Sequence, residues 1–199
     1  MIAIIDYAIN NLRSVEKAFQ SLGTDVLATD APEEIRRADK IVLPGVGAFA
    51  DAMSNLKAKN LEGVIRQKVA AGTPLLGLCL GLQLLFSESE EFGRHFGFNF
   101  IPGKVVRIPA GLKVPHIGWN QLHIKRLDPL LKGIEEGSFV YFVHSYYANP
   151  QSQDDVLATS DYGIEFPAIA NRKNVWATQF HPEKSQQIGL RILKNFAEM

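Results

Sequence analysis

The first half of the chain alternates between short apolar runs and longer segments with apolar residues at every third or fourth position. The short runs predict buried strands over residues 2–5, 26–28, 40–43 and 74–78. The helical spacing predicts helices over residues 12–22, 32–38, 49–59, 61–71 and 80–86, with Asp30 as a candidate cap for the second. Strands and helices that alternate in this way are typical of an α/β fold with a largely parallel sheet.

The second half has a different pattern, because its strand candidates follow one another with short turns. They span residues 105–108, 122–124, 139–143, 156–159, 168–170 and 175–180. A final segment, 186–196, has its apolar residues on one helical face. We therefore expect one α/β domain over residues 1–199. Its sheet should be mostly parallel, open and twisted, with helices on both faces and extra antiparallel strands in the C-terminal half.

The single cysteine of the chain lies between the strand predicted over 74–78 and the helix that follows it. Gly77 and Gly81 lie two positions to either side of Cys79, which gives the pattern G-x-C-x-G, a cysteine version of the nucleophile elbow. A sharp turn of this kind needs neighbours without a Cβ atom, so that strand and helix can approach closely. The helix start would favour the thiolate and could bind an anion. Considered alone, Cys79 could equally be a small buried residue of the core.

A nucleophilic cysteine needs a histidine that a third group holds in place. Five histidines are scattered along the chain without the short spacings of a zinc site, so we expect no metal. His181 directly follows the strand predicted over 175–180 and opens the motif H-P-E. Residues two apart in an extended chain point to the same side, so we expect Glu183 to accept a hydrogen bond from His181. In isolation, the motif would instead indicate a histidine at a strand end and a surface glutamate.

The same chemistry needs an oxyanion hole, a set of backbone N–H groups aimed at the tetrahedral intermediate. One candidate donor is Leu80, the residue after the cysteine. The other is the segment 44–47, in which Val46 and Gly47 are the candidate residues, because glycines let a peptide plane turn its N–H inward. By itself, this segment would indicate an ordinary turn between a strand and a helix.

The amino-acid composition of the chain argues against several classes of partner and location. Of the 199 residues, 46% are hydrophobic, and 21 basic residues balance 21 acidic ones. A zero net charge gives no electrostatic attraction to nucleic acid or to an anionic membrane, so we expect neither as a partner. A single cysteine, the lack of a basic leader, and a longest apolar run (74–86) below the ~20 residues of a membrane helix predict a soluble cytoplasmic protein. The acidic residues Glu88, Glu90 and Glu91 indicate a solvated helix end.

Three motifs together resemble those of the class I glutamine amidotransferases, which use a catalytic triad. They are LPGVG at 43–47, GLCLGLQ at 77–83 and QFHPEKS at 179–185. Two further motifs, PHIGWN at 115–120 and YFVHSY at 141–146, are similar to those of the glutaminase subunits of imidazole glycerol phosphate synthase, from histidine biosynthesis. The resemblance extends over essentially the whole chain.

The resemblance implies a reaction and a set of site residues. Cys79 would attack the side-chain amide of L-glutamine, and His181, oriented by Glu183, would transfer the proton. A glutamyl thioester would form and be hydrolysed to glutamate, with ammonia as the other product and no cofactor. The substrate-binding residues that it implies are Gln83, His144, Ser145 and Tyr146. The side chain of His144 could instead be satisfied inside the end of the sheet.

The resemblance also implies a partner, a (β/α)₈-barrel cyclase or synthase subunit that forms a heterodimer with the glutaminase and receives its ammonia. The barrel subunit would make imidazole glycerol phosphate and AICAR. The docking residues that the resemblance implies are Asn11, Trp119, Tyr141 and Lys184. Trp119 and Tyr141 belong, with Tyr146 and Tyr147, to an aromatic set that suits an interface. The loop over residues 6–12 departs from the family, because it lacks the glycines often found there.

In the family, the oxyanion hole is poorly formed in the free subunit, so we expect weak glutaminase activity alone and strong activation by the partner with its nucleotide. Two other enzymatic functions remain as alternatives. One is a glutaminase subunit of another pathway, such as pyridoxal phosphate synthesis, and the other is a stand-alone γ-glutamyl cysteine hydrolase. A regulatory module with a dead site is the third alternative, and an intact set of Cys79, His181 and Glu183 argues against it.

Overall fold

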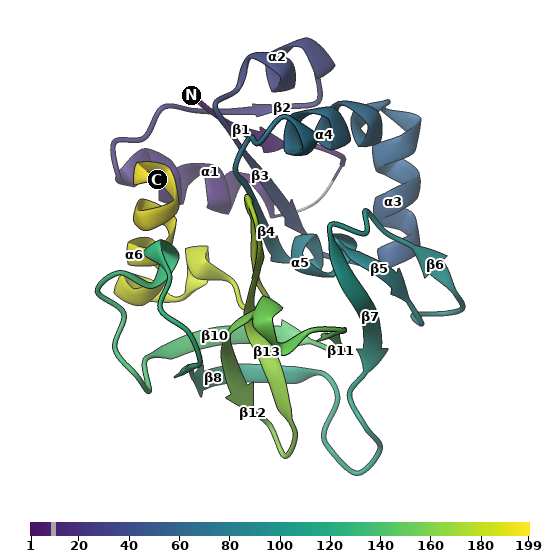
Figure 1. The fold of residues 1–199 in the computed structure, drawn as a ribbon, viewed down its shortest axis with the longest axis vertical. Coiled ribbons are helices and arrows are strands. Elements are labelled where there is room, and N and C mark those ends of the chain that lie inside the picture. The colour runs from purple at the N-terminus through teal and green to yellow at the C-terminus, as the bar shows by residue number, and fades with distance from the viewer. Residues whose placement is uncertain (9–10) are drawn as a thin grey trace.

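Five parallel strands form the centre of the fold in a computed structural model, which describes residues 1–8 and 11–199 (Figure 1). They lie in the order β2 (Val26–Thr29), β1 (Ile2–Ile5), β3 (Lys40–Gly45), β4 (Leu75–Cys79) and β14 (Val175–Thr178). Antiparallel strands extend the sheet beyond β14, in the order β13 (Glu165–Arg172), β12 (Val156–Asp161) and β9 (His123–Ile124). This confirms the expected parallel sheet with antiparallel strands in the C-terminal half.

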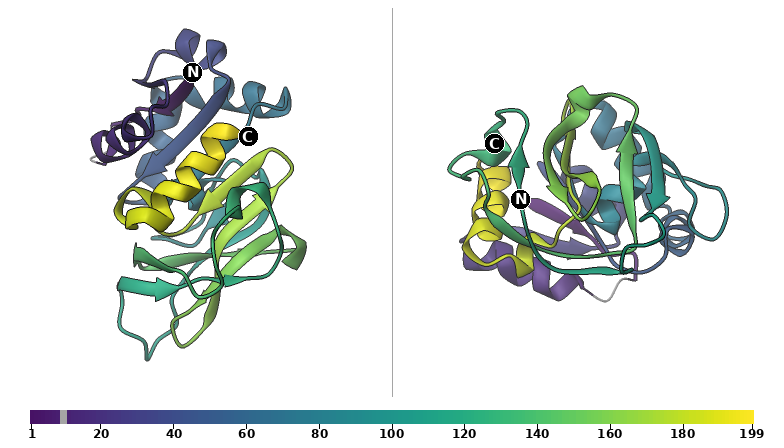
Figure 2. Two further views of the ribbon diagram at one scale, coloured as in Figure 1. Left: turned by 90° about the vertical axis from the view of Figure 1, so that its left-hand side faces the viewer. Right: turned by 90° about the horizontal axis from the view of Figure 1, so that it is seen from below.

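Helices cover both faces of this sheet, as expected. One face carries α1 (Leu12–Ser21) and α6 (Gln186–Glu198), which lie side by side (Figure 2). The other face carries α2 (Pro32–Arg37), α3 (Phe49–Ala58), α4 (Leu61–Ala70) and α5 (Leu80–Leu84). In β1, Ile2 and Ile4 join the cluster under α1 and α6, whereas Ala3 and Ile5 join the cluster on the opposite face. Successive side chains of a strand point to opposite faces, so a strand covered on both sides is a continuous apolar run.

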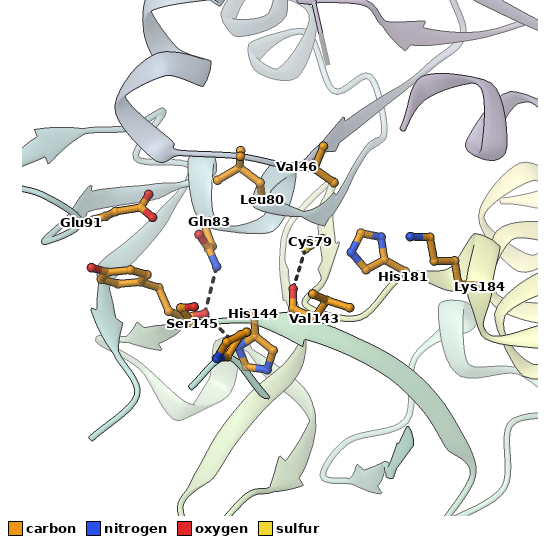
Figure 3. Close-up of a pocket in the computed structure, with 13 residues that line it drawn as sticks. Val46, Cys79, Leu80, Gln83, Glu91, Val143, His144, Ser145, His181 and Lys184 are labelled. Atoms are coloured by element: carbon orange, nitrogen blue, oxygen red, sulfur yellow. Dashed lines mark hydrogen bonds between the residues drawn. The ribbon is translucent and has the colours of Figure 1, made fainter. Parts of the chain in front are cut away.

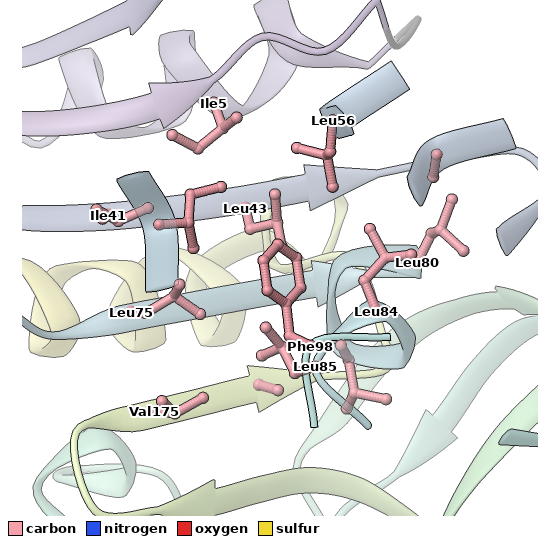
Figure 4. Packing of buried hydrophobic residues seen from close by; sticks show 14 of the residues in the cluster. Ile5, Ile41, Leu43, Leu56, Leu75, Leu80, Leu84, Leu85, Phe98 and Val175 are labelled. Atoms are coloured by element: carbon pink, nitrogen blue, oxygen red, sulfur yellow. The ribbon is translucent and has the colours of Figure 1, made fainter. Parts of the chain in front are cut away.

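Figure 4 shows the packing between the sheet and the second group of helices. Leu43 of β3, Leu75 of β4 and Val175 of β14 belong to a cluster that also contains Leu56 and Phe98. All five side chains are buried. Burying one side chain of this size stabilises a fold by roughly 1.5–3 kcal/mol. The cluster therefore fixes β3 and β4, whose carboxyl ends carry the candidate site.

Two smaller sheets are formed by the middle of the chain. One has the order β11 (Tyr146–Pro150), β7 (Ile101–Arg107), β5 (Phe86–Ser89) and β6 (His95–Phe96). The other pairs β8 (His116–Gln121) with β10 (Phe139–His144). Three single-turn 3₁₀ helices complete the fold: η1 (Pro129–Leu131), η2 (Gln153–Asp155) and η3 (Pro182–Lys184). The hydrophobic pattern predicts no strand at β5, β6, β8 or β11.

Two local expectations are wrong. The helix expected over 80–86 ends at Leu84, so the acidic run does not lie at its end, and Glu88 belongs to strand β5. The Glu88 carboxylate lies 2.6 Å from Arg94 Nη2 and 3.0 Å from Lys104 Nζ, and these two cations compensate its burial. Asp30 does not cap α2, because its carboxylate lies 2.7 Å from Lys59 Nζ.

Within residues 1–8 and 11–199, no helix is both long enough and apolar enough to cross a membrane. The same residues include no group of three or more His, Cys, Asp or Glu side chains placed to hold a metal ion. The loop over 6–12, where the sequence departs from the family, contains residues 9–10, which lie outside the described residues.

Candidate active site

Cys79 occupies a strained turn at the junction of β4 and α5. Its φ is +55° and its ψ is −108°, in a region that residues with a side chain rarely adopt. The flanking glycines are required by close approach: a Cβ atom on Gly81 would lie 1.8 Å from the carbonyl oxygen of Leu43, and one on Gly77 would lie 2.7 Å from the carbonyl oxygen of Gly81. The expected strand–turn–helix is present, and it presents the thiol at the end of the sheet.

His181 and Glu183 lie at the end of the neighbouring strand β14. His181 Nδ1 is 2.8 Å from Glu183 Oε1, and the side chains of both residues are almost fully buried. The expected contact is present, but the expectation of an extended chain between the two residues is wrong. Pro182 begins the 3₁₀ helix η3, and this turn directs the Glu183 carboxylate back toward the His181 ring. Asn11, at the start of α1, also donates a hydrogen bond to Glu183 Oε1. Two donors from separate elements therefore fix this carboxylate.

Burial and charge together set the protonation of this pair. Burial alone would lower the pKa of His181, but the Cys79 sulfur and the Glu183 carboxylate outweigh it and raise that pKa to about 10. Burial also disfavours the charged form of Glu183, yet the hydrogen bond and charge of His181, with help from Asn11, hold the pKa of this carboxyl below its usual range. At neutral pH an imidazolium faces a carboxylate, and His181 holds a proton that it can transfer.

The site opens on a cavity of about 340 Å³ (Figure 3). Most of the residues expected in the site line this cavity, and Glu183 lies behind His181. The lining residues are Val46, Gly47, Cys79, Leu80, Gln83, Glu91, Pro115, Val143, His144, Ser145, Tyr146, His181 and Lys184. The cavity is large enough for an amino acid beside the thiol.

Three further residues in or beside the site are not among the site residues expected from the sequence. The Val143 carbonyl oxygen is 3.8 Å from Cys79 Sγ, a weak hydrogen bond that holds the thiol at the cavity wall. The Glu91 carboxylate accepts a hydrogen bond of 2.7 Å from the backbone N–H of Phe49, so this residue secures the start of α3 beside the cavity. Gln179 is fully buried, and its Oε1 lies 3.4 Å from Gln83 Nε2.

The buried side chain of Tyr7 bonds the backbone of the segment 44–47. Its side chain is fully buried, and its hydroxyl donates a hydrogen bond of 2.6 Å to the carbonyl oxygen of Pro44. Burial raises the pKa of Tyr7, and the nearby Cys79 adds to this shift, so the phenol stays neutral. A Cβ atom on Gly45 would lie 2.5 Å from the Tyr7 hydroxyl. Gly45 is therefore needed for this contact, which the sequence did not reveal.

Both ring nitrogens of His144 have hydrogen-bond partners inside the end of the sheet, which is the alternative that the sequence left open for this side chain. Its Nδ1 lies 2.9 Å from the carbonyl oxygen of Tyr146, and its Nε2 lies 3.0 Å from His116 Nδ1. Burial lowers the pKa of His144 to about 3, so the ring is neutral at physiological pH. Its neighbours Ser145 and Tyr146 line the cavity.

The residues expected at a docking face differ in their exposure and contacts. Trp119 of β8 is 45% exposed and meets Tyr141 of β10 edge to face, with ring centroids 5.8 Å apart. Ile117 and Phe139 are also exposed on this two-stranded sheet, so it presents an apolar surface. Lys184 is exposed at the rim of the cavity. Asn11, in contrast, directs its side chain to Glu183.

Comparisons with known proteins agree with this geometry. The family model for class-I glutamine amidotransferases matches residues 3–199. The HisH subunit of imidazole glycerol phosphate synthase from Syntrophotalea carbinolica is 56% identical, with 100% of both chains covered. That of Moorella thermoacetica is 54% identical and covers 100% of this chain and 94% of its own.

Solved structures show the same fold. A glutamine amidotransferase matches with a TM-score of 0.79 at 19% identity, over 100% of this chain and 98% of its own. The PurLQS structure from Thermotoga maritima matches with a TM-score of 0.76 at 16% identity, over 99% and 97%. At such identities, these structures support the fold alone. The chain belongs to the class-I glutamine amidotransferases and, within them, to the family of HisH subunits of imidazole glycerol phosphate synthase.

Proposed function

We propose that this chain hydrolyses L-glutamine to glutamate and ammonia as the glutaminase subunit of imidazole glycerol phosphate synthase. The observation that carries the proposal is the arrangement of Cys79, His181 and Glu183, on the ends of two adjacent parallel strands, at a cavity of about 340 Å³. The relatives at 54–56% identity carry the name of that subunit, which favours it over a glutaminase of another pathway or a stand-alone hydrolase.

The reaction proceeds through a covalent intermediate. Cys79 Sγ, whose proton His181 holds, attacks the side-chain amide carbon of glutamine, so that a C–S bond forms and the carbonyl oxygen becomes an oxyanion. His181 gives its proton to the amide nitrogen, the C–N bond breaks, and ammonia leaves. A water molecule then attacks the thioester while His181 takes its proton, which releases glutamate and regenerates Cys79. Glu183 stays ionised and stabilises the imidazolium.

The backbone N–H groups of Leu80 and of the Val46–Gly47 segment are the proposed oxyanion donors. All three residues line the cavity beside Cys79. Losing one such donor costs on the order of 10²–10³ in rate. A Val46 peptide turned away from the cavity in the free subunit would therefore explain a weak activity that rises when the partner binds. Gln83, Ser145 and Tyr146, with the backbone of His144, are the proposed contacts of the substrate.

The proposed partner is a (β/α)₈-barrel synthase subunit that forms a heterodimer with this chain. Ammonia released into water would be protonated, so transfer within a complex keeps it reactive. The exposed aromatic surface around Trp119 and Tyr141, with Lys184 at the cavity rim, is the proposed docking face. We also propose that residues 1–199 act as one catalytic domain, because the family model extends over 3–199. The similar bacterial subunits of a biosynthetic enzyme support a place in the cytoplasm.

Glutamate release from glutamine tests this proposal in three mixtures: the chain alone, the chain with a barrel subunit, and the chain with that subunit and its nucleotide substrate. We expect a large rise in the third mixture only. High activity of the chain alone would instead support a stand-alone hydrolase, and the proposed roles of the Val46 segment and the docking face would be wrong.

A further inference from the structure

Two buried histidines form a hydrogen-bonded pair beside the cavity, and the reaction above uses neither side chain. His116 begins β8 and His144 ends β10, and the two residues are register partners in the antiparallel pair. His116 Nδ1 lies 3.0 Å from His144 Nε2. Both residues are at most 5% exposed. A polar pair buried this deeply is held in one arrangement by its hydrogen bonds.

The partners of His144 determine the tautomers of both rings. The Tyr146 carbonyl oxygen, 2.9 Å from His144 Nδ1, can only accept a hydrogen bond, so Nδ1 of His144 carries the hydrogen. Because the ring is neutral, His144 Nε2 is an acceptor. The hydrogen between the two rings must therefore belong to His116 Nδ1. The result is a directed chain from His116 through His144 to the Tyr146 carbonyl.

This chain ends at the wall of the cavity. The Tyr146 carbonyl oxygen also accepts a hydrogen bond of 3.0 Å from Gln83 Nε2, so two donors from different elements fix one carbonyl group. Between His144 and Tyr146 lies Ser145, and all three residues line the cavity, as does Gln83 (Figure 3). A shift of the Tyr146 carbonyl would displace this whole wall.

Aromatic stacking restricts the first ring of the chain. His116 is stacked between Phe142, with ring centroids 5.1 Å apart, and Tyr162, with centroids 4.0 Å apart. The two stacking contacts hold the plane of the His116 ring, and within that plane the hydrogen bond to His144 selects the orientation that places Nδ1 toward Nε2 of His144. Stacking therefore holds the ring in place, and the Tyr146 carbonyl sets the direction of the hydrogen bonds.

We propose that His116 and His144 are positioning residues for glutamine binding, which hold the Tyr146 carbonyl and the 144–146 wall in the geometry that the substrate needs. This inference rests on the proposed glutaminase function. Neither ring exchanges a proton with the substrate. Their effect is on the affinity for glutamine, with little effect on the chemical step.

Binding of L-glutamine by NMR titration in the Cys79→Ala background tests the pair without turnover. His116→Phe keeps an aromatic ring for stacking but removes the donor to His144. His116→Asn loses the ring and places an amide N–H near the position of Nδ1. We expect His116→Phe to weaken glutamine binding about 5- to 30-fold, the effect of a buried hydrogen bond worth one to two kcal/mol, and His116→Asn to retain more of the affinity. His123→Asn is the control, because His123 is a half-exposed histidine that bonds Glu136 and does not line the cavity.

Nitrogen-15 chemical shifts of the two rings give a second measurement that needs no variant to fold. We expect both histidines to be neutral with the hydrogen on Nδ1, whereas a free histidine prefers the hydrogen on Nε2. An Nε2–H tautomer of His144, or unchanged affinity in a folded His116→Phe variant, would overturn the inference. The expected tautomers together with a complete lack of glutamine binding in the Cys79→Ala background would count against the proposed function instead.

Discussion

The Glu183 carboxylate bonds the imidazole of His181, and a tight backbone turn between the two residues makes this contact possible. The carboxylate lies 2.8 Å from the imidazole, and the 3₁₀ helix that begins at Pro182 fixes the two residues on one side of the chain. Asn11, 172 positions away in the sequence, donates to the same oxygen. The orientation of the histidine is thus set by two elements that only the fold brings together.

We predict that Glu183→Gln will lower kcat for glutamine hydrolysis strongly. The amide cannot stabilise an imidazolium as a carboxylate does, and its NH₂ group can face His181 Nδ1 and favour the wrong tautomer. The loss should be on the order of 10²–10⁴, the range of a general acid–base contribution. Steady-state glutamate release by the assembled complex measures it. Ammonia-dependent synthesis by the same complex is the control, and an unchanged kcat would remove Glu183 from the triad.

Cys79→Ala should abolish glutamine-dependent synthesis by the complex and leave ammonia-dependent synthesis intact. In the proposed reaction the thiol is the nucleophile that attacks glutamine, whereas the second reaction belongs to the proposed barrel subunit. Product formation with either nitrogen source, measured on the same assembled sample, separates the two activities. If a folded, assembled Cys79→Ala complex lost both, the proposed division of labour would be wrong.

The central sheet could be predicted from the sequence because both of its faces are buried. β1, β3 and β4 are covered on each side and therefore have continuous apolar runs. β5 and β8 lack this signal. In β5, the buried Glu88 is compensated by Arg94 and Lys104, and in β8 the exposed Ile117 lies among polar residues and glycine. A pattern based on hydrophobicity cannot detect strands that are stabilised by ion pairs or left open to a surface.

The candidate site could be predicted where its chemistry depends on neighbours in the sequence. Gly77 and Gly81 mark the turn at Cys79, and Pro182 marks the turn after His181. The contacts of Tyr7 with Pro44 and of Asn11 with Glu183 could not be predicted, because each joins residues far apart in the chain. Common residue types in buried positions carry no signal of such contacts until the fold is known.

Trp119→Ala should weaken association with the barrel subunit. Trp119 is 45% exposed beside Tyr141, on an apolar surface that also includes Ile117 and Phe139. Truncating a central aromatic residue of an interface costs at least about 2 kcal/mol, so Kd should rise about 30-fold. Titration calorimetry of the two subunits measures it. Leu127→Ala is the control, because Leu127 is 91% exposed and its neighbour Arg126 bonds Asn171 beside the beginning of β14, at the end of the sheet opposite the site. Equal affinities of the two variants would place the docking face elsewhere.

Stability should fall in mild acid partly because of His144. Burial, with His116 and His181 nearby, lowers the pKa of His144 from 6.5 to about 3, although the Tyr146 carbonyl opposes this shift. Between these two values the unfolded chain binds the proton and the folded chain does not. The contribution of His144 is therefore complete above pH 6.5 and is lost as the pH falls toward 3.

Urea unfolding of the wild-type chain and of His144→Asn, at half-unit steps between pH 4 and 7.5, measures this contribution. The variant should have a lower free energy of unfolding at pH 7.5. Below pH 6.5 its free energy of unfolding should fall less steeply than that of the wild type, and the two slopes should differ by up to about 1.4 kcal/mol per pH unit. His123→Asn removes a half-exposed imidazole whose Nδ1 lies 2.9 Å from Glu136 Oε1, and it shows how much of the pH dependence comes from a histidine outside the buried pair. If the free energies of unfolding of the wild type and of His144→Asn changed in parallel with pH, the pKa of His144 in the folded chain would not be lowered as stated here.

Gly81→Ala should disrupt the turn that presents Cys79. The added methyl group would lie 1.8 Å from the backbone oxygen of Leu43, and β3 cannot move away because both of its faces are packed. We expect the free energy of unfolding to fall by about 3 kcal/mol or more, at the upper end of the cost of overpacking. Gly63→Ala is the matched control: Gly63 lies inside α4, and apart from the adjacent residues and the backbone of its own helix no described atom comes within 4 Å of its added Cβ. It should stabilise the chain by about 0.5–1 kcal/mol, because alanine loses less conformational freedom in a helix. Urea unfolding measures both, and a Gly81→Ala variant as stable as the wild type would show that α5 does not need this close contact with β3.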